Sequence, residues 1–166
     1  MILICYDGSA DARAAIADAG PVLSGHPAIV LTVWEPLSEI LARTPAGAGL
    51  MAGLGESGAA DDETRQAATR TAEEGVQLAR AAGFDPTART RAQSGSISDT
   101  IIAEADVANA TAIVMGSRGR TGLQSVLGSV SHAVVQGADR AVMVVPSADI
   151  AAARRERLQA HRRDRE

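Results

Sequence analysis

The 166-residue chain is 46% hydrophobic but only 2% aromatic, so its core must consist of small aliphatic side chains, as in a parallel β-sheet covered by helices. Its single cysteine, Cys5, excludes an intrachain disulfide, and no apolar run is long enough for a signal peptide or a membrane span, so we expect one cytoplasmic domain. The formal charge is −4 and all 16 basic residues are arginine, which excludes the Gly-Lys-Ser/Thr motif of Walker-type nucleotide hydrolases.

Strand-like and helix-like segments alternate along the chain. Five short runs, most of them apolar, predict β-strands at residues 2–7, 28–36, 87–93, 112–117 and 141–146. The segments between them carry apolar residues at helical spacing and predict helices at residues 10–19, 61–83, 99–110 and 129–138. Because such crossovers are right-handed, we expect an α/β, Rossmann-like fold with a five-stranded parallel sheet and helices on both faces.

Local signals predict several helix ends. Ser9 and Ser98 are the expected N-caps of the first and third helices, because a serine hydroxyl can accept a hydrogen bond from the first free N–H groups of a helix. Gly20 and Pro21 predict a break or kink in the first helix, since both residues disfavour a helix interior. Gly83 predicts the end of the second helix.

Two segments lack a regular pattern. Residues 36–60 are rich in glycine and alanine without a steady period, and we interpret them as a mobile insert. Residues 148–166 hold six of the arginines and almost no apolar face, so we expect a mobile, Arg-rich tail. Acidic residues interrupt the positive charge of this tail, so nucleic-acid binding is not expected. The organised domain is therefore predicted to span residues 1–147.

The segment MGSRGRTGLQSVLGSVSH, residues 115–132, leads from the carboxyl end of a predicted strand to the amino end of a predicted helix. Ligands of open α/β sheets bind at this edge. Gly116, Gly119 and Gly128 would let backbone N–H groups approach a ligand closely, and Ser129 adds a hydroxyl at the positive end of the helix dipole. These features suit a diphosphate or triphosphate. The alternative is a flexible loop followed by an ordinary helix cap.

Asp7 ends the first predicted strand and is followed by Gly8 and Ser9. The carboxyl ends of parallel strands share one edge of the sheet, so the Asp7 carboxylate is expected near the glycine-rich segment. The alternative for this Asp-Gly-Ser sequence is a turn that only caps the next helix.

These segments resemble the universal stress protein family, in particular its ATP-binding branch. ILICYDGS resembles the family's first strand, GSISDTIIAEA (95–105) the segment leading into its third helix, and GSRGRTGLQSVLGSVS followed by ADRAVMVVP its glycine motif and last strand. The resemblance covers residues 2 to 146 except for the insert. It implies the strand order 3-2-1-4-5.

The resemblance also implies a nucleotide site. Asp7 matches the family residue that contacts the sugar or adenine side of the nucleotide, and Val33 the position whose backbone meets adenine, although Val33 could equally be a core residue. The positions that match the phosphate loop are Gly116, Gly119, Gly128, Ser129 and Val130, with Ser131 as a further candidate. The family motif has nine residues between its last two glycines, whereas this chain has eight between Gly119 and Gly128.

A family member with this site is expected to be a stress-response regulatory protein that binds ATP, with or without Mg²⁺, and acts by binding. Two alternatives stay open: an enzyme with slow ATP hydrolysis or nucleotidyl chemistry, and an interaction module that binds no nucleotide. No catalytic residue and no metal site is predicted, because no base, lysine or metal-ligand spacing accompanies the motif.

A homodimer is expected through the strand at residues 141–146. This strand lies at one edge of the implied sheet and is apolar throughout, whereas Arg89 and Arg91 place charge on the strand at the other edge. If this strand paired antiparallel with the same strand of a second copy, a two-fold axis would relate the two chains and neither edge would stay exposed.

Overall fold

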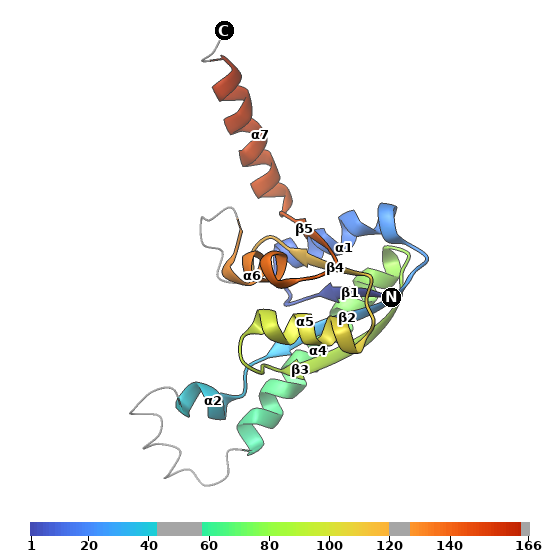
Figure 1. Ribbon diagram of the computed structural model, residues 1–166, viewed down its shortest axis with the longest axis vertical. Coiled ribbons are helices and arrows are strands. Elements are labelled where there is room, and N and C mark those ends of the chain that lie inside the picture. The colour runs from blue at the N-terminus through green and yellow to red at the C-terminus, as the bar shows by residue number, and fades with distance from the viewer. Residues whose placement is uncertain (43–57, 120–126, 164–166) are drawn as a thin grey trace.

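A computed structural model describes residues 1–42, 58–119 and 127–163 (Figure 1). The strands are β1 (Ile2–Cys5), β2 (Pro27–Trp34), β3 (Asp85–Ala92), β4 (Ala112–Gly116) and β5 (Ala141–Val145). The helices are α1 (Ala10–Leu23), α2 (Leu37–Ala42), α4 (Gly58–Ala81), α5 (Ile97–Val107), α6 (Ser129–Gly137) and α7 (Ala148–Arg163). All strand pairs are parallel and the order is β3-β2-β1-β4-β5, which confirms the predicted α/β fold and strand order.

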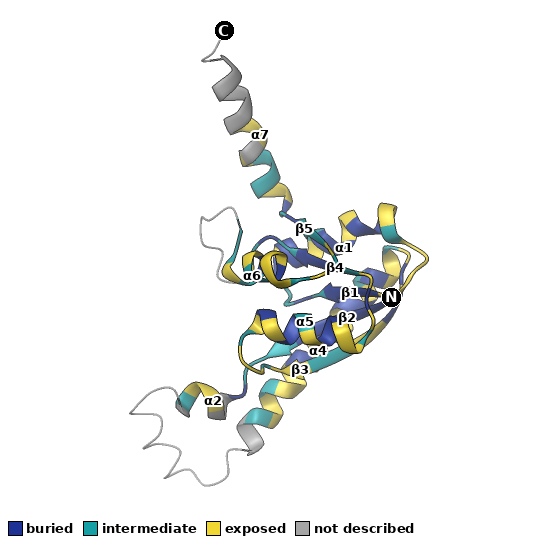
Figure 2. Cartoon of the chain, in the orientation of Figure 1, coloured by how far each residue is buried: buried dark blue, intermediate teal, exposed yellow. Residues whose placement is uncertain are grey.

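Helices cover both faces of the sheet, so its central strands are buried on each side (Figure 2). Alternation along β1 sends Ile2 and Ile4 to the core beneath α1 and α4, and Leu3 to the core beneath α5 and α6. All three side chains are at most 2% exposed. This two-sided burial explains why the strands appear in the sequence as continuous apolar runs.

A stripe of small residues brings α4 close to the sheet. Four residues at helical spacing along this helix are all buried: Ala68, Ala72, Val76 and Ala79. Gly75 lies within this face, where an added Cβ would come within 2.7 Å of the Tyr6 ring and of Val30. The small side chains therefore set the distance at which α4 packs over β2 and β3.

The structure differs from the sequence prediction at two helix ends. Helix α1 is not broken at Gly20 but continues through Pro21 to Leu23. The bare Gly20 packs against Ala82, whose carbonyl oxygen would lie 2.7 Å from an added Cβ, and this tertiary contact favours the helical path through the last turn. Helix α5 is capped by Ser96, not Ser98, because Ser96 forms a reciprocal capping box with Asp99.

Helices form in parts of the two segments that lack a regular sequence pattern. Within the predicted insert, residues 37–42 form α2 and residues 58–60 begin α4, while residues 43–57 lie outside the described part of the chain. The predicted tail forms α7, which projects away from the sheet (Figure 1). Alanine and arginine are strong helix formers, and this propensity outweighs the lack of an apolar face.

The two sheet edges differ in chemistry. On β3, Arg89 and Arg91 both pair with Glu104 of α5, a carboxylate residue that is only 6% exposed. One of the two positive charges on this edge is thus balanced by a carboxylate of the protein. On β5, Val142, Met143 and Val144 are half-buried. Met143 packs against the core on one face of the sheet, and Val142 and Val144 pack against the core on the other face.

Among the described helices, none is both long and apolar enough to cross a membrane.

Candidate functional site

A cavity of about 370 Å³ lies at the carboxyl edge of the sheet. It opens between β1 and β4, whose following helices, α1 and α6, turn to opposite faces of the sheet, as expected at the switch point of an open α/β sheet. The structure brings all eight predicted site residues to its wall: Asp7, Val33, Gly116, Gly119, Gly128, Ser129, Val130 and Ser131.

The turn after β1 fixes Asp7 at the cavity. One carboxylate oxygen, Oδ1, accepts the Ser9 N–H at 3.0 Å, and Gly8 between them has φ +80°, a conformation that favours glycine. Ser9 in turn caps α1 by accepting the Ala12 N–H at 3.2 Å. The second oxygen, Oδ2, lies beside Gly119, where an added Cβ would come within 3.0 Å of it. Asp7 therefore does form the turn that leads into the capped helix, but this turn uses only one of its two carboxylate oxygens.

The backbone of Val33 points toward the cavity. Tyr6 N–H donates to Leu31 C=O at 2.9 Å, so the backbone groups of Leu31 face β1. Backbone groups of alternate strand residues point to the same side, so those of Val33 also face the β1 side. Because β1 ends at Cys5, that side borders the cavity at the level of Val33. The position thus offers an N–H donor and a C=O acceptor whatever its side chain.

Apolar side chains form the wall near Val33. They are Leu31 from β2, Met115 from β4, and Ile97 and Ile101 from the first turns of α5. Ile97 is 37% exposed, so it presents an apolar surface to the cavity. Sequence analysis missed these four residues, and the available signal was Ile97, an apolar residue placed directly after the helix cap.

The opposite end of the cavity is formed by the amino end of α6. Its N-cap is Gly128, which has no side chain to satisfy the N–H groups of the first turn, whereas Ser9 and Ser96 cap α1 and α5 with their hydroxyls. These N–H groups carry the positive end of the helix dipole. The exposed Ser129 follows directly and lines the cavity. The arrangement suits an anion.

Ser131 is placed differently from the other candidates. It is only 2% exposed, and its hydroxyl donates to Ser117 C=O at 2.8 Å, with Gly128 C=O 3.1 Å away. Its hydroxyl proton is therefore used within the wall. Arg118, which the sequence analysis did not select, also lines the cavity, while residues 120–126 of the glycine-rich segment lie outside the described residues.

The ionisable side chains at the cavity favour binding over nucleophilic chemistry. Burial, together with the charge of Asp7, raises the pKa of Cys5 to about 12, so its thiol stays protonated at neutral pH. Burial and a 2.6 Å hydrogen bond to Glu74 raise the pKa of Tyr6 to about 12 as well. Within the described residues, no three His, Cys, Asp or Glu side chains are grouped as metal ligands.

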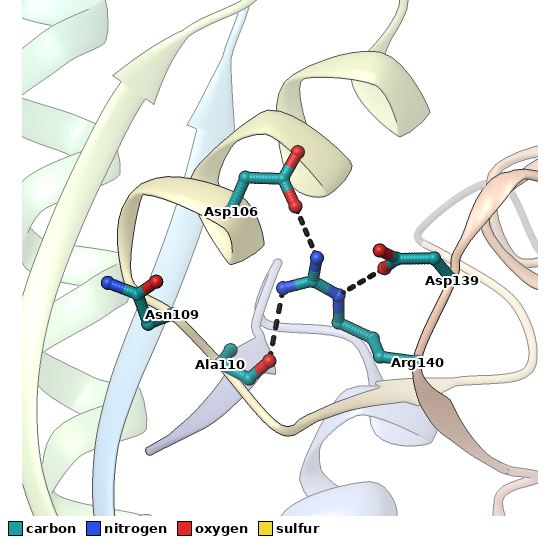
Figure 3. A pocket seen from close by; sticks show the side chains of 5 residues that line it. All are labelled: Asp106, Asn109, Ala110, Asp139 and Arg140. Carbon is teal, nitrogen blue, oxygen red and sulfur yellow. Dashed lines mark hydrogen bonds and ion pairs between the residues drawn. The ribbon is translucent and has the colours of Figure 1, made fainter.

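A second hollow lies at the other end of the sheet, before β4 and β5 (Figure 3). Its centre is Arg140, whose guanidinium donates to Asp139 Oδ1 at 2.7 Å, to Ala110 C=O at 3.0 Å and to the Asp106 carboxylate. All these partners belong to the protein, so the guanidinium joins two loops and α5. This hollow is therefore structural, and the cavity at the carboxyl edge is the candidate ligand site.

Comparison with known proteins agrees with this fold. Residues 1–146 match the universal stress protein family. Solved structures with the same fold include UspA from Lactobacillus plantarum (23% identity, 87% of this chain and 95% of that one, TM-score 0.63). Two others are a universal stress protein in complex with cAMP (24%, 89% and 97%, 0.58) and the Archaeoglobus fulgidus protein in complex with dAMP (21%, 87% and 95%, 0.58). The comparison with curated proteins gave no match.

Proposed function

The chain belongs to the universal stress protein family, and from this premise we propose that it is a stress-response regulatory protein that binds an adenine nucleotide, with ATP as the favoured ligand. The ligand occupies the cavity at the carboxyl edge of the sheet. The complexes of related proteins with cAMP and dAMP support an adenine nucleotide in general.

One observation carries the proposal: the chemistry of the cavity wall changes from apolar to anion-binding along its length. Adenine fits the apolar end, where the backbone of Val33 offers a donor and an acceptor. The ribose hydroxyls fit Asp7, whose Oδ2 lies on the wall. The phosphates fit the uncapped first turn of α6 and the hydroxyl of Ser129. The volume of about 370 Å³ lies within the range of about 300–1,000 Å³ typical of small-molecule sites.

The proposed activity is binding without efficient turnover. The phosphate end offers backbone N–H groups and a serine hydroxyl, which hold an anion but do not activate water. The chain has no lysine for a Walker-type mechanism. Mg²⁺ would arrive with ATP, coordinated by its phosphates, and no protein ligand is assigned to it.

We also propose that the protein forms a homodimer through the outer edge of β5. Val142, Met143 and Val144 are only half-buried in the single chain, and an apolar edge strand of this kind is prone to pair with another strand. Helix α7 leaves the body instead of folding back over this edge (Figure 1). A second copy is the partner that closes the edge symmetrically.

Mass spectrometry of the ligand released from freshly purified protein tests the proposed function. Intact ATP is the expected result. ADP accompanied by phosphate release on incubation with ATP would favour the slow hydrolase. A protein that carries no nucleotide and shows no calorimetric signal with ATP would favour the interaction module and contradict the proposal.

A further inference from the structure

A buried carboxylate lies directly behind the proposed phosphate end of the cavity. Asp11, in the first turn of α1, is only 6% exposed. Its Oδ2 accepts the Ser117 hydroxyl at 2.7 Å and the Arg118 N–H at 3.0 Å. Both partners lie more than 100 positions further along the chain, at the start of the glycine-rich turn. A carboxylate is seldom buried without such partners, so these contacts define its position.

Ser117, which Asp11 holds, forms hydrogen bonds with the elements on both sides of the glycine-rich turn. Its N–H donates to Val145 C=O at 2.7 Å, which ties it to β5. Its own C=O accepts the Gly128 N–H at 2.7 Å and the Ser131 hydroxyl at 2.8 Å. Ser117 is 1% exposed, and all three of its polar groups are engaged. One residue thus holds the end of β4, the N-cap of α6 and, through Asp11, the start of α1.

Close packing of α1 reinforces this arrangement. A Cβ on Gly116 would lie 2.7 Å from the Asp11 carbonyl carbon and 2.8 Å from the Ala12 nitrogen. The backbone after β4 is therefore pressed against the same turn of α1 that supplies the carboxylate. The contacts of Asp11 set where the glycine-rich turn leaves the sheet, and the Ser117–Gly128 hydrogen bond sets where α6 begins.

We propose that Asp11 is a positioning residue for phosphate recognition: it holds the turn through Ser117 so that the first-turn N–H groups of α6 converge on the phosphates, and it does not itself contact the nucleotide. This inference rests on the proposed function. At the adenine end, the backbone of Val33 and the side chains of Leu31, Ile97 and Ile101 belong to β2 and α5, which these hydrogen bonds do not join, so loss of the contact is expected to affect the phosphates more than the adenine.

Hydrogen bonding, not charge, carries this role. The Arg118 guanidinium lies 3.9 Å from Asp11 Oδ2, so a positive group accompanies the carboxylate. Asparagine can present an oxygen in place of Oδ2 and accept the same two hydrogen bonds without the charge. Alanine removes both. Asp11→Asn should therefore retain ATP binding, and Asp11→Ala should lose it.

The experiment compares ATP with adenosine by calorimetry in wild type, Asp11→Ala, Asp11→Asn and the control Asp18→Ala, which removes an exposed acidic residue from the same helix. For Asp11→Ala, the Kd for ATP should rise about tenfold or more, while the Kd for adenosine stays within about twofold. Asp11→Asn and Asp18→Ala should stay close to wild type for both ligands. Ser117→Ala, which removes the hydroxyl donor, should repeat the selective loss if Asp11→Ala fails to fold.

Equal losses for ATP and adenosine in Asp11→Ala, or in Ser117→Ala if that variant is used, would overturn the inference, because general destabilisation does not distinguish the two ligands. Unchanged ATP affinity in these variants would overturn it as well. If wild type itself binds neither ligand, the proposed function fails and this inference fails with it. If wild type binds ATP but the variant loses affinity for ATP and adenosine equally, only the positioning role of Asp11 is refuted, and the proposed function stands.

Discussion

Substitution of Gly128 should separate nucleotide binding from folding. The backbone angles of this N-cap, φ −69° and ψ 161°, are extended and open to any residue. A Cβ there would lie 3.4 Å from Arg118 Cα and from Ser117 O, which is an ordinary contact. We expect the remaining carbons of Gly128→Leu to occupy the cavity, because Gly128 forms part of its wall. The fold should survive while the phosphates lose their site.

The magnitudes of these two effects differ. Leucine is a poorer N-cap than glycine, so the free energy of unfolding should fall by about 1 kcal/mol or less. If the leucine keeps the phosphates from two first-turn N–H groups, each worth about 1.5–3 kcal/mol to a charged acceptor, the Kd for ATP should rise about a hundredfold or more. Gly116→Ala is the contrasting control. Its Cβ would lie 2.7 Å from the backbone of α1, so the free energy of unfolding should fall by about 1–3 kcal/mol.

Calorimetric titration with ATP and chemical denaturation of the same samples measure both quantities. A folded Gly128→Leu protein with wild-type affinity for ATP would refute the placement of the phosphates at α6. Unchanged stability of Gly116→Ala would refute the close packing of β4 against α1.

Further predictions concern the rest of the site and the β5 edge. Asp7→Ala should weaken ATP and adenosine alike, whereas Ser129→Ala should cost about 1.5–3 kcal/mol for ATP and spare adenosine, and calorimetry that found equal losses in both variants would remove the basis for their separate assignments. Val144→Arg should give a monomer of reduced stability that still binds ATP, and a wild-type mass near 17 kDa by light scattering at tens of micromolar protein (about 10–100 μM) would contradict the dimer. The raised pKa of Cys5, about 12, should make its thiol react slowly with iodoacetamide at pH values well below 12. Rapid labelling of the folded protein at such a pH would contradict the raised pKa.

The fold was predictable because its strongest signals are local. Runs such as residues 112–117 show no polar alternation, since the strands are covered on both faces, and the stripe from Ala68 to Ala79 follows helical spacing. The strand order required the family resemblance, because pattern alone does not say which parallel strands are neighbours. The end of α1 was missed because its packing against Ala82, a tertiary contact, favours a helix that passes through Gly20 and Pro21.

The candidate site was predictable only in part. The cavity-lining positions Gly116 and Gly128 could be selected from the glycine spacing and from their place after a strand, at the carboxyl edge of the sheet. Asp11 could not, because an acidic residue in the first turn of a helix ordinarily serves the helix dipole, and its partner Ser117 is 106 positions away. Ile97 was missed for a similar reason, since only the fold brings α5 over the cavity.

A crystal structure of the protein grown with ATP is the most direct test of the central claim. We expect adenine beside the backbone of Val33, the ribose at Asp7, and the phosphates within hydrogen-bond distance, about 2.7–3.2 Å, of the first-turn N–H groups of α6. Crystals grown at saturating ATP that show this cavity without nucleotide, or nucleotide bound elsewhere on the chain, would contradict the account.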